Sequence, residues 1–362
     1  CTWRIFDGRL AHALEVYIGR EEVLFFMIRF AIVGMGHIAK KHMDAIAKAE
    51  GAELAAVCDT NPERLRDVSD VPVYTDMERM LKENEQIEVV NICVPSGLHA
   101  PLTKLAARYH RHIIVEKPMA LRTSDAEEMI RAAKEYKVRL AVVHPNRFRP
   151  AIRKLKEAMD RGMFGKLSHA NATVRWNRNQ AYYDQAAWRG TKEFDGGVLM
   201  NQAIHNLDLL LWLMGPVKAV QAMAATRLRK IETEDVATAV VEFESGALGV
   251  IEAATTIYPQ NLEESIAIFG EKASVKIGGR TANFIETWEA EGVDEEERAR
   301  LIDEINADPF GKPGHQWIIE DMVQAIREGR EPIVTGLDGL APVRLIEAIL
   351  RSAETGTRVK LS

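Results

Sequence analysis

The chain has 362 residues, of which 47% are hydrophobic, so it is long enough to form two domains with a sizeable core. Its formal net charge of −6 argues against a general nucleic-acid binder, and no apolar run approaches the length of a membrane span. The three cysteines show neither a disulfide framework nor the spacing of a metal site, which fits a reducing cytoplasm and predicts no bound metal.

Residues 1–26 mix apolar and charged residues and lack the uninterrupted apolar core of a signal peptide. Met27 directly precedes the first clean strand. We interpret residues 1–26 as an N-terminal extension of uncertain status, such as an over-long translation start, and place the first domain at residues 27–146.

A dinucleotide-binding turn follows the first predicted strand, Ile28–Val33. Residues 34–39 have the pattern G-x-G-x-x-A and lead into a predicted helix. Gly34 permits a tight turn, and Gly36 lets the backbone approach a pyrophosphate at the helix N-terminus. The pattern is weak alone, but the second strand ends at Asp59, whose carboxylate would accept hydrogen bonds from the adenosine ribose and favour NAD over NADP. The cofactor contacts expected here are Gly34, Gly36, His37, Ile38 and Asp59.

Strands and helices continue to alternate through the first half of the chain. Predicted strands at residues 53–58, 89–94, 112–115 and 140–143 are separated by helical segments, which indicates βαβ units, a parallel sheet and hence a Rossmann domain. Ligands bind at the carboxyl ends of such strands, so polar residues that follow the strands predict a cofactor cleft. The residues assigned to cofactor binding in this way are Pro95, Ser96, His99, Glu116 and Lys117, and His144 and Asn146 follow the last strand.

The triplet Glu116-Lys117-Pro118 directly follows the strand at residues 112–115. Proline restricts the backbone of the residue before it, so Lys117 is held in place rather than flexible. Beside a nicotinamide its ammonium group would orient a substrate hydroxyl and stabilise a developing alkoxide. The alternative is an ordinary surface lysine, which the flanking residues make the weaker interpretation.

Residues 196–215 have the pattern of an apolar helix that ends at Gly215, with Pro216 just beyond. At about 100° per residue, Asn201, His205 and Asp208 fall within roughly 60° of one another, as a polar stripe on an apolar helix. The stripe is either a partly wetted face with a hydrogen-bonded core histidine or the site of a catalytic histidine. The helix by itself does not decide between the two.

The second half of the chain, residues 147–362, changes pattern. Alternating apolar residues predict a series of strands between residues 167 and 277, with hairpin turns at Ser245-Gly246 and Glu271-Lys272. Residues 289–308 are expected to form a solvated helix and loop. We therefore predict an α/β protein in which a C-terminal α/β domain has a large, mostly antiparallel open sheet. The outer face of that sheet is expected to mediate homo-oligomerisation, as a dimer or tetramer.

A long loop, residues 178–195, contains Tyr183, Trp188 and Arg189. Loops of this length are commonly functional, and aromatic faces together with arginine suit a sugar and its anionic groups. The alternative is a surface loop that packs on itself.

The chain resembles the glucose–fructose oxidoreductase / inositol dehydrogenase family over about residues 28–362. The motifs that carry the resemblance are the Gly34-x-Gly36 turn with Asp59, the Glu116-Lys117-Pro118 triplet, and the helix with Asn201, His205 and Asp208. That family pairs a Rossmann domain with a C-terminal α/β domain whose open sheet covers the cleft. The resemblance implies NAD as cofactor, Lys117 as the residue that positions the reacting hydroxyl and His205 as the general base. It leaves Asp208 as an orienting group rather than a reactant.

A narrower group, the bacterial UDP-N-acetylglucosaminuronate 3-dehydrogenases of surface-polysaccharide synthesis, looks similar at residues 175–177, 182–184, 188–191 and 195–202. In the broad family the position of Asn201 is often Asp, whereas the narrower group resembles this chain in having Asn. Its substrate is anionic at both the diphosphate and the carboxylate, so Arg147, Arg175, Arg178 and Arg189 are expected to face these groups. The substrate contacts that the resemblance implies are Asn146, Arg147, Arg175, Tyr183, Trp188, Arg189, Asn201 and His205.

These observations predict a cytoplasmic, NAD-dependent oxidoreductase that oxidises a secondary hydroxyl of a small-molecule sugar substrate, in first place C3 of UDP-N-acetylglucosaminuronate. A dehydrogenase of a free sugar or cyclitol is an alternative that shares every catalytic residue. A non-catalytic NAD or sugar sensor is a second alternative, but such a protein should have lost Lys117 or His205. A metal site at His205 and Asp208 is not expected, since two ligands are too few.

Overall fold

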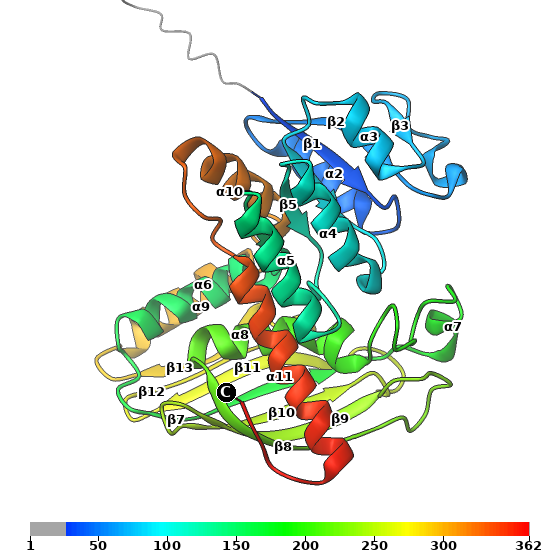
Figure 1. Ribbon diagram of the computed structural model, residues 1–362. Coiled ribbons are helices and arrows are strands. Elements are labelled where there is room, and N and C mark those ends of the chain that lie inside the picture. The colour runs from blue at the N-terminus through cyan, green and yellow to red at the C-terminus, as the bar shows by residue number, and fades with distance from the viewer. Residues whose placement is uncertain (1–26, 362) are drawn as a thin grey trace, which may run out of the picture.

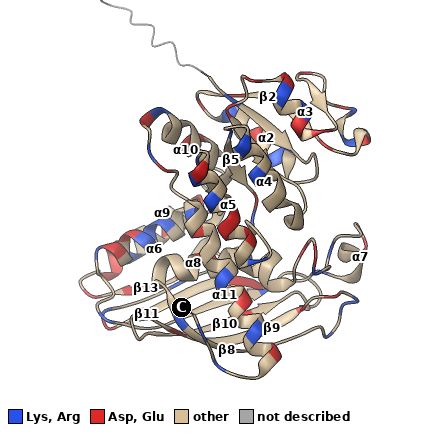
Figure 2. Cartoon of the chain, in the orientation of Figure 1, with Lys and Arg blue, Asp and Glu red and all other residues tan. Residues whose placement is uncertain are grey.

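The computed structural model describes residues 27–361, so the expectation about residues 1–26 lies outside the described residues. Two sheets form the molecule, and Figure 1 shows the first lying above the second. Figure 2 shows Lys and Arg interspersed with Asp and Glu over the elements rather than gathered by sign on one side. Among the described residues, no helix is both long and apolar enough to cross a membrane.

The first sheet has six parallel strands in the order β3-β2-β1-β4-β5-β6. This is the dinucleotide-binding order, in which the chain reverses its direction of winding between β1 and β4, and ligands bind in the crevice at that point. The prediction of a Rossmann domain is confirmed. The strands are β1 (Ile28–Val33), β2 (Ala52–Cys58), β3 (Val73–Tyr74), β4 (Val89–Ile92), β5 (His112–Val115) and β6 (Leu140–Val142); the helices between them are α2 (Ala39–Lys48), α3 (Met77–Glu83), α4 (His99–Arg108) and α5 (Thr123–Glu135).

The second sheet has eight strands in the order β13-β12-β11-β7-β10-β9-β8-β14. Only β7 and β10 pair in parallel, so the prediction of a mostly antiparallel sheet is confirmed. Both predicted hairpin turns lie between antiparallel neighbours, β9 with β10 and β11 with β12. The strands are β7 (Leu167–Arg175), β8 (Val217–Ala225), β9 (Val236–Phe243), β10 (Leu248–Ala254), β11 (Glu263–Gly270), β12 (Ala273–Gly278), β13 (Phe284–Ala290) and β14 (Val359–Lys360).

Two boundaries differ from the sequence expectation. The acidic segment expected from residue 289 begins inside β13, and its helix, α9, spans Glu295–Ala307. The strand was not predicted because most of β13 is exposed and several of its residues are charged. Only Ile285 and Trp288 of this strand are fully buried. In the expected loop at residues 178–195, the short helix α7 (Gln180–Tyr183) begins at Asn179, whose side chain accepts a hydrogen bond from the Tyr182 amide.

The apolar stretch predicted as one helix is a π-helical turn, Leu199–Ala203, followed by α8 (Ile204–Met214). Gly215 ends α8 as expected, with a φ of +85° that glycine adopts without strain. Asn206 donates hydrogen bonds to the backbone oxygens of Thr173 on β7 and Ser265 on β11, and so fixes α8 on the inner face of the second sheet. Each fully buried leucine on α8 contributes about 1.5–3 kcal/mol of hydrophobic stabilisation.

The last two helices connect the two sheets, as Figure 1 shows for α11. α10 (Gly314–Glu328) packs against α2 of the first domain, and α11 (Gly336–Thr355) packs against α5, α8 and β8. The Val142 amide of β6 donates to the Val334 oxygen just before α11. The expected boundary at residue 146 therefore separates the strands of the two sheets. It does not separate the helices, because α10 and α11 follow the boundary in sequence but pack against α2 and α5 of the first domain.

Candidate active site

A cavity of about 750 Å³ lies between the carboxyl ends of the first sheet and the helices that cover the second. It receives side chains from α2, α8, β11 and the start of α10, from the segments that follow β5, β6 and β7, and from the segment before α10. The sequence-predicted residues that line it are His37, Ile38, Glu116, Lys117, Asn146 and His205. Segments far apart in the sequence therefore meet at the edge where a Rossmann sheet binds its ligands.

The glycine-rich turn after β1 fits a dinucleotide. Gly34 has a φ of +95°, and a Cβ at this position would lie 2.6 Å from the Cys93 oxygen at the end of β4. Around Gly36, in contrast, no atom of residues 27–361 other than those of Gly36 and its chain neighbours lies within 4 Å of where a Cβ would be, so a pyrophosphate can approach the backbone. Asp59 accepts hydrogen bonds from the amides of Met35 and Asn61, each at 2.8 Å, which holds the carboxylate beside this turn. The residues present therefore fit NAD.

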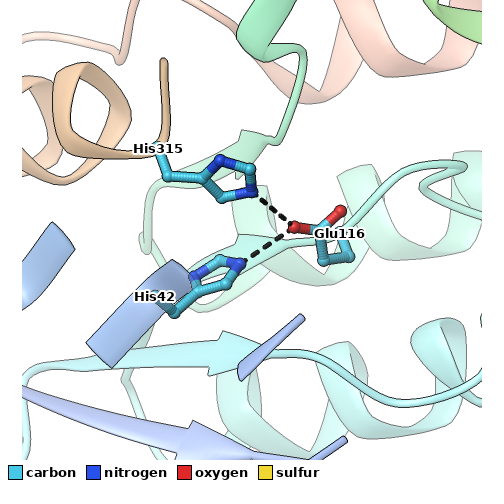
Figure 3. A group of neighbouring side chains, drawn as sticks. All are labelled: His42, Glu116 and His315. Atoms are coloured by element: carbon cyan, nitrogen blue, oxygen red, sulfur yellow. Dashed lines mark hydrogen bonds and ion pairs between the residues drawn. The ribbon is translucent and has the colours of Figure 1, made fainter. Parts of the chain in front are cut away.

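Glu116 is buried at the end of β5 and joins three segments, as Figure 3 shows. Its Oε1 lies 2.9 Å from Nε2 of His42 on α2 and 3.1 Å from Nε2 of His315 on α10. Burial alone would raise the pKa of Glu116, but the hydrogen bonds from His315 and His42 outweigh it and hold the pKa well below its usual range. Glu116 is thus a carboxylate that connects α10 to the cofactor cleft.

The atoms of His42, Glu116 and His315 lie within 4.8 Å of one another, close enough to share a metal ion. However, the Asn91 amide nitrogen lies 3.0 Å from Nδ1 of His42 and can only donate. Nε2 of His42 therefore carries the hydrogen and donates it to Glu116. Hydrogen bonds account for this cluster, and the absence of a metal stays a prediction.

Lys117 and His205 face the same cavity from opposite domains. The Lys117 ammonium donates to the backbone oxygen of Asn201 at 2.8 Å, which fixes its position. Burial lowers the pKa of Lys117 from its usual range. Burial, with the nearby positive charge of Lys117, lowers the pKa of His205 well below 6.5. His205 is therefore neutral near pH 7, as a proton acceptor must be.

Asn201 has a different contact from the one expected. Its side-chain amide donates to Asp195, and its backbone oxygen rather than its side chain meets Lys117. The π-helical turn at residues 199–203 changes the direction of Asn201 relative to α8, which an ideal helical wheel does not capture. Asn201 thus positions Lys117.

Arg147 was expected to contact the substrate, but the structure gives it an internal role. Its guanidinium forms two hydrogen bonds with Asp208, at 2.6 and 2.8 Å, and one with Asp338 at 2.9 Å. Arg147 and Asp208 are both buried. Asp208 also lies 3.7 Å from Nδ1 of His144, so it acts behind the cavity wall and not on the substrate.

Replacing Arg147 with Met leaves the Asp208 carboxylate buried without its main partner. We expect the free energy of unfolding to fall by about 3–5 kcal/mol, measured by guanidinium denaturation. Arg175→Met is the matched control, because Arg175 also pairs with two carboxylates but its side chain is 38% exposed. That variant should change stability by about 1 kcal/mol or less. Equal losses in the two variants would contradict the assignment of Arg147 to the core.

Arg175, Tyr183, Trp188 and Arg189 were also expected to contact the substrate, and none of them lines this cavity. Arg175 pairs with Glu252 and Glu263. The Tyr183 hydroxyl lies 3.2 Å from that of Thr255. The Arg189 guanidinium lies over the rings of Tyr182 and Trp188, at 4.3 and 4.7 Å from their centroids. These contacts match the alternative in which the loop packs on itself.

Of the residues expected after β4, His99 differs most from its expected role. Its ring nitrogens lie 2.8 Å from the Pro118 oxygen and 2.9 Å from the Val94 oxygen, and the side chain is buried. His99 therefore holds the turn after Lys117 through these contacts and does not line the cavity. Pro95 and Ser96 form the turn before α4, and Ser96 lines a smaller pocket beside Lys192.

The cavity also contains Arg178, one of the four arginines expected to face an anionic substrate, and three residues that were not assigned to it, Arg149, Trp176 and Glu264. Strand alternation could have found two of them. On β7, Ala170, Ala172 and Val174 are buried, so the same face continues to Trp176 rather than to Arg175. On β11, Ile266 and Ile268 face inward, and so does Glu264. The sequence around Arg147 and Arg149 contains no signal that tells which of the two arginines lines the cavity.

Comparison with known proteins agrees with this architecture. Residues 28–144 match the oxidoreductase family with an NAD-binding Rossmann fold, and residues 152–276 match the GFO/IDH/MocA C-terminal domain. Myo-inositol 2-dehydrogenase of Thermotoga maritima is 26% identical over 344 residues, which cover 92% of this chain and 98% of the relative.

Two solved structures of WlbA dehydrogenases, from Bordetella pertussis and Chromobacterium violaceum, each contain NADH and UDP-GlcNAcA. They are 39% and 40% identical to this chain, with TM-scores of 0.89 and 0.88. Each match covers 93% of this chain and 98% or 96% of the solved one. The chain therefore belongs to the GFO/IDH/MocA family and is an NAD-dependent sugar oxidoreductase.

Proposed function

We propose that this protein oxidises the C3 hydroxyl of UDP-N-acetylglucosaminuronate with NAD, in the synthesis of a surface-polysaccharide precursor. The observation that carries the proposal is the pair Lys117 and His205, which line one cavity beside a turn that fits NAD. The likeness to the two WlbA dehydrogenases supports this substrate, because their structures contain UDP-GlcNAcA.

In the proposed reaction, His205 accepts the proton of the reacting hydroxyl, and its neutral state leaves a ring nitrogen free to do so. Lys117 donates a hydrogen bond to the same oxygen and stabilises the negative charge that develops there. Bound NAD would supply the hydride acceptor. Two hydrogen bonds keep Lys117 in place. Its backbone amide donates to Oε2 of Glu116 at 3.2 Å, and its ammonium group donates to the backbone oxygen of Asn201 at 2.8 Å.

Arg178 suits the anionic part of such a substrate. Its guanidinium stacks on Trp176 and Tyr182, at 4.9 and 5.3 Å from the ring centroids. Its hydrogen bonds go to the Asn177 oxygen and the Asn261 side chain. Within residues 27–361, no carboxylate lies within ion-pair distance of Arg178, unlike Arg147 and Arg175. A rigid, uncompensated guanidinium on a cavity wall is a ready partner for a carboxylate or phosphate.

The substrate assignment is tested with a panel assayed by NADH formation. We expect UDP-N-acetylglucosaminuronate to give the highest kcat/KM. UDP-N-acetylglucosamine, which lacks the carboxylate, should react with a kcat/KM lower by about tenfold to a hundredfold, the value of one charged hydrogen bond. Mass spectrometry of nucleotide that copurifies with the protein identifies bound NAD independently. A higher kcat/KM for the uncharged sugar nucleotide would overturn the assignment.

A dehydrogenase of a free sugar or cyclitol is the second candidate, and the relative from Thermotoga maritima favours it. Myo-inositol in the same panel separates the two.

Homo-oligomerisation stays a prediction, and the exposed Met223, Val240, Leu248 and Val250 on the outer face of the second sheet suit it.

A further inference from the structure

Glu264 is a buried acid on the cavity wall that the proposed chemistry does not use. It lies at the start of β11, opposite Val174 of β7, and faces inward with the cavity-lining His205. Its Oε1 accepts a hydrogen bond from the Asn146 amide at 3.0 Å. Its Oε2 is buried and has no hydrogen-bond partner among residues 27–361.

A carboxyl group in this position is costly for the protein alone. Glu264 is 1% exposed, and burial raises its pKa to about 7 against the opposing effects of Arg149 and Asn146. A buried acceptor without a donor destabilises the folded state. An apolar side chain such as those of Ile266 and Ile268 would fill the same face of β11 without that cost.

The charged neighbours of Glu264 do not satisfy the free oxygen. Nη1 of Arg149, at the start of α6 (Pro150–Asp160), lies 3.9 Å from Oε1, the oxygen that Asn146 already holds. That nitrogen donates to the Thr281 oxygen. The other titratable groups that line the cavity come from five places in the chain: His37, Lys41, Asp44 and Lys48 at and before α2, Glu116 and Lys117 after β5, Arg178 after β7, His205 on α8, and Lys312 and His315 around the start of α10. Oε2 of Glu264 therefore receives no hydrogen bond from any residue between 27 and 361.

We propose that Glu264 is a specificity residue whose free oxygen accepts a hydrogen bond from a hydroxyl or amide N–H of the sugar ring. The inference rests on the proposed function, because it takes a sugar as the occupant of the cavity. Asn146 acts as the positioning residue, since it holds Oε1 and leaves Oε2 without a partner on a residue of the cavity wall. The carboxylate also repels anions, so it directs the charged groups of the substrate away from β11 and toward Arg178.

This role makes substrate binding depend on pH. A donor from the sugar stabilises the ionised form of Glu264, so the substrate binds the carboxylate and not the carboxylic acid. The free-enzyme pKa of about 7 then sets the window. KM should fall as the pH rises through 7 and should level off once Glu264 is ionised. His205 titrates below this window, because burial lowers its pKa well below 6.5.

The experiment compares wild type, Glu264→Gln and Glu263→Gln, using UDP-N-acetylglucosaminuronate from pH 6 to 9. Gln keeps the shape of Glu264 and an oxygen for Asn146 but places an NH₂ group where an acceptor is needed. Its KM above pH 8 should rise about tenfold to a hundredfold, with kcat much less affected and the pH dependence of KM removed. Glu263 is the matched control, because it pairs with Arg175 and Lys276 outside the cavity. Its variant should behave as wild type.

Melting temperature and NADH binding, measured for all three proteins, show whether Glu264→Gln remains folded. A folded variant with unchanged KM and an unchanged pH profile overturns the inference and leaves the proposed function standing. If wild type does not turn over this substrate, the proposed function fails and the inference fails with it. UDP-2-deoxyglucuronate, which has no donor at C2, identifies the donor. The effect of the Gln variant persists if a ring hydroxyl donates to Oε2 and disappears if the amide N–H does.

Discussion

Replacing Lys117 with Ala is expected to abolish detectable turnover, with kcat lower by about 10²–10⁴-fold, while NADH still binds. The ammonium group reaches into the cavity from the end of β5 and is held by the Asn201 oxygen at 2.8 Å. The nearby His42, Glu116 and His315 are held by hydrogen bonds to one another and so do not replace it. The loss should therefore fall on kcat.

The matched control is Lys104→Ala, since Lys104 forms an ion pair with Glu128 outside the cavity. Stopped-flow or steady-state NADH formation gives kcat, and nucleotide fluorescence gives NADH affinity. The Lys117 variant also leaves the Asn201 oxygen without its donor, so a small loss of melting temperature is expected. Turnover within tenfold of wild type would show that Lys117 does not act on the reacting hydroxyl.

Replacing His205 with Asn should lower kcat by about 10²–10⁴-fold, the usual contribution of a positioned general base. His205 is suited to this role because it lines the cavity and because its lowered pKa keeps the ring neutral, so that a ring nitrogen can accept a proton. Asn is smaller and cannot accept a proton, so the cavity remains while the base is lost. His169→Asn is the control, because His169 lies on the exposed face of β7 and stacks on Phe269.

The pH dependence of kcat gives a second check on His205. A base acts in its neutral form, and burial lowers the pKa of His205 well below 6.5. As the pH falls through 6.5, His205 therefore stays neutral, and kcat at saturating substrate should hold until a lower pH. A fall of kcat centred at 6.5 would mean that the base is a solvated histidine elsewhere.

Much of the first domain follows from local sequence. The G-x-G-x-x-A spacing predicts a turn, and the structure shows why: Gly34 has a positive φ and lies against β4, and Gly36 leaves open space. Lys117 follows a continuous apolar strand, so its place at the carboxyl edge could be predicted without knowing its neighbours. Period-two alternation likewise predicted the hairpins of the second sheet.

Side-chain partners across long separations could not be predicted in this way. Arg147 and Arg149 stand in one short segment, yet the first binds Asp208 in the core and the second lines the cavity. Glu116 and His315 are 199 residues apart and meet only because α10 returns to α2. Hydrophobic periodicity and motif spacing do not show which side chains meet across such separations. These contacts depend on how α10 and α11 pack against both domains.

Lys117 and His205 became catalytic candidates through the resemblance to a known family, whereas the NAD-binding turn and the order of strands and helices follow from local sequence. These features depend on contacts within a strand, a turn or a helix, which local periodicity encodes. Only the tertiary structure decided which arginine faces the cavity, that Asn201 holds Lys117 through its backbone, and that Glu264 lies beside Asn146. Those outcomes depend on strand register and on the packing of α8 against β7 and β11, where one residue of difference moves a side chain to the opposite face.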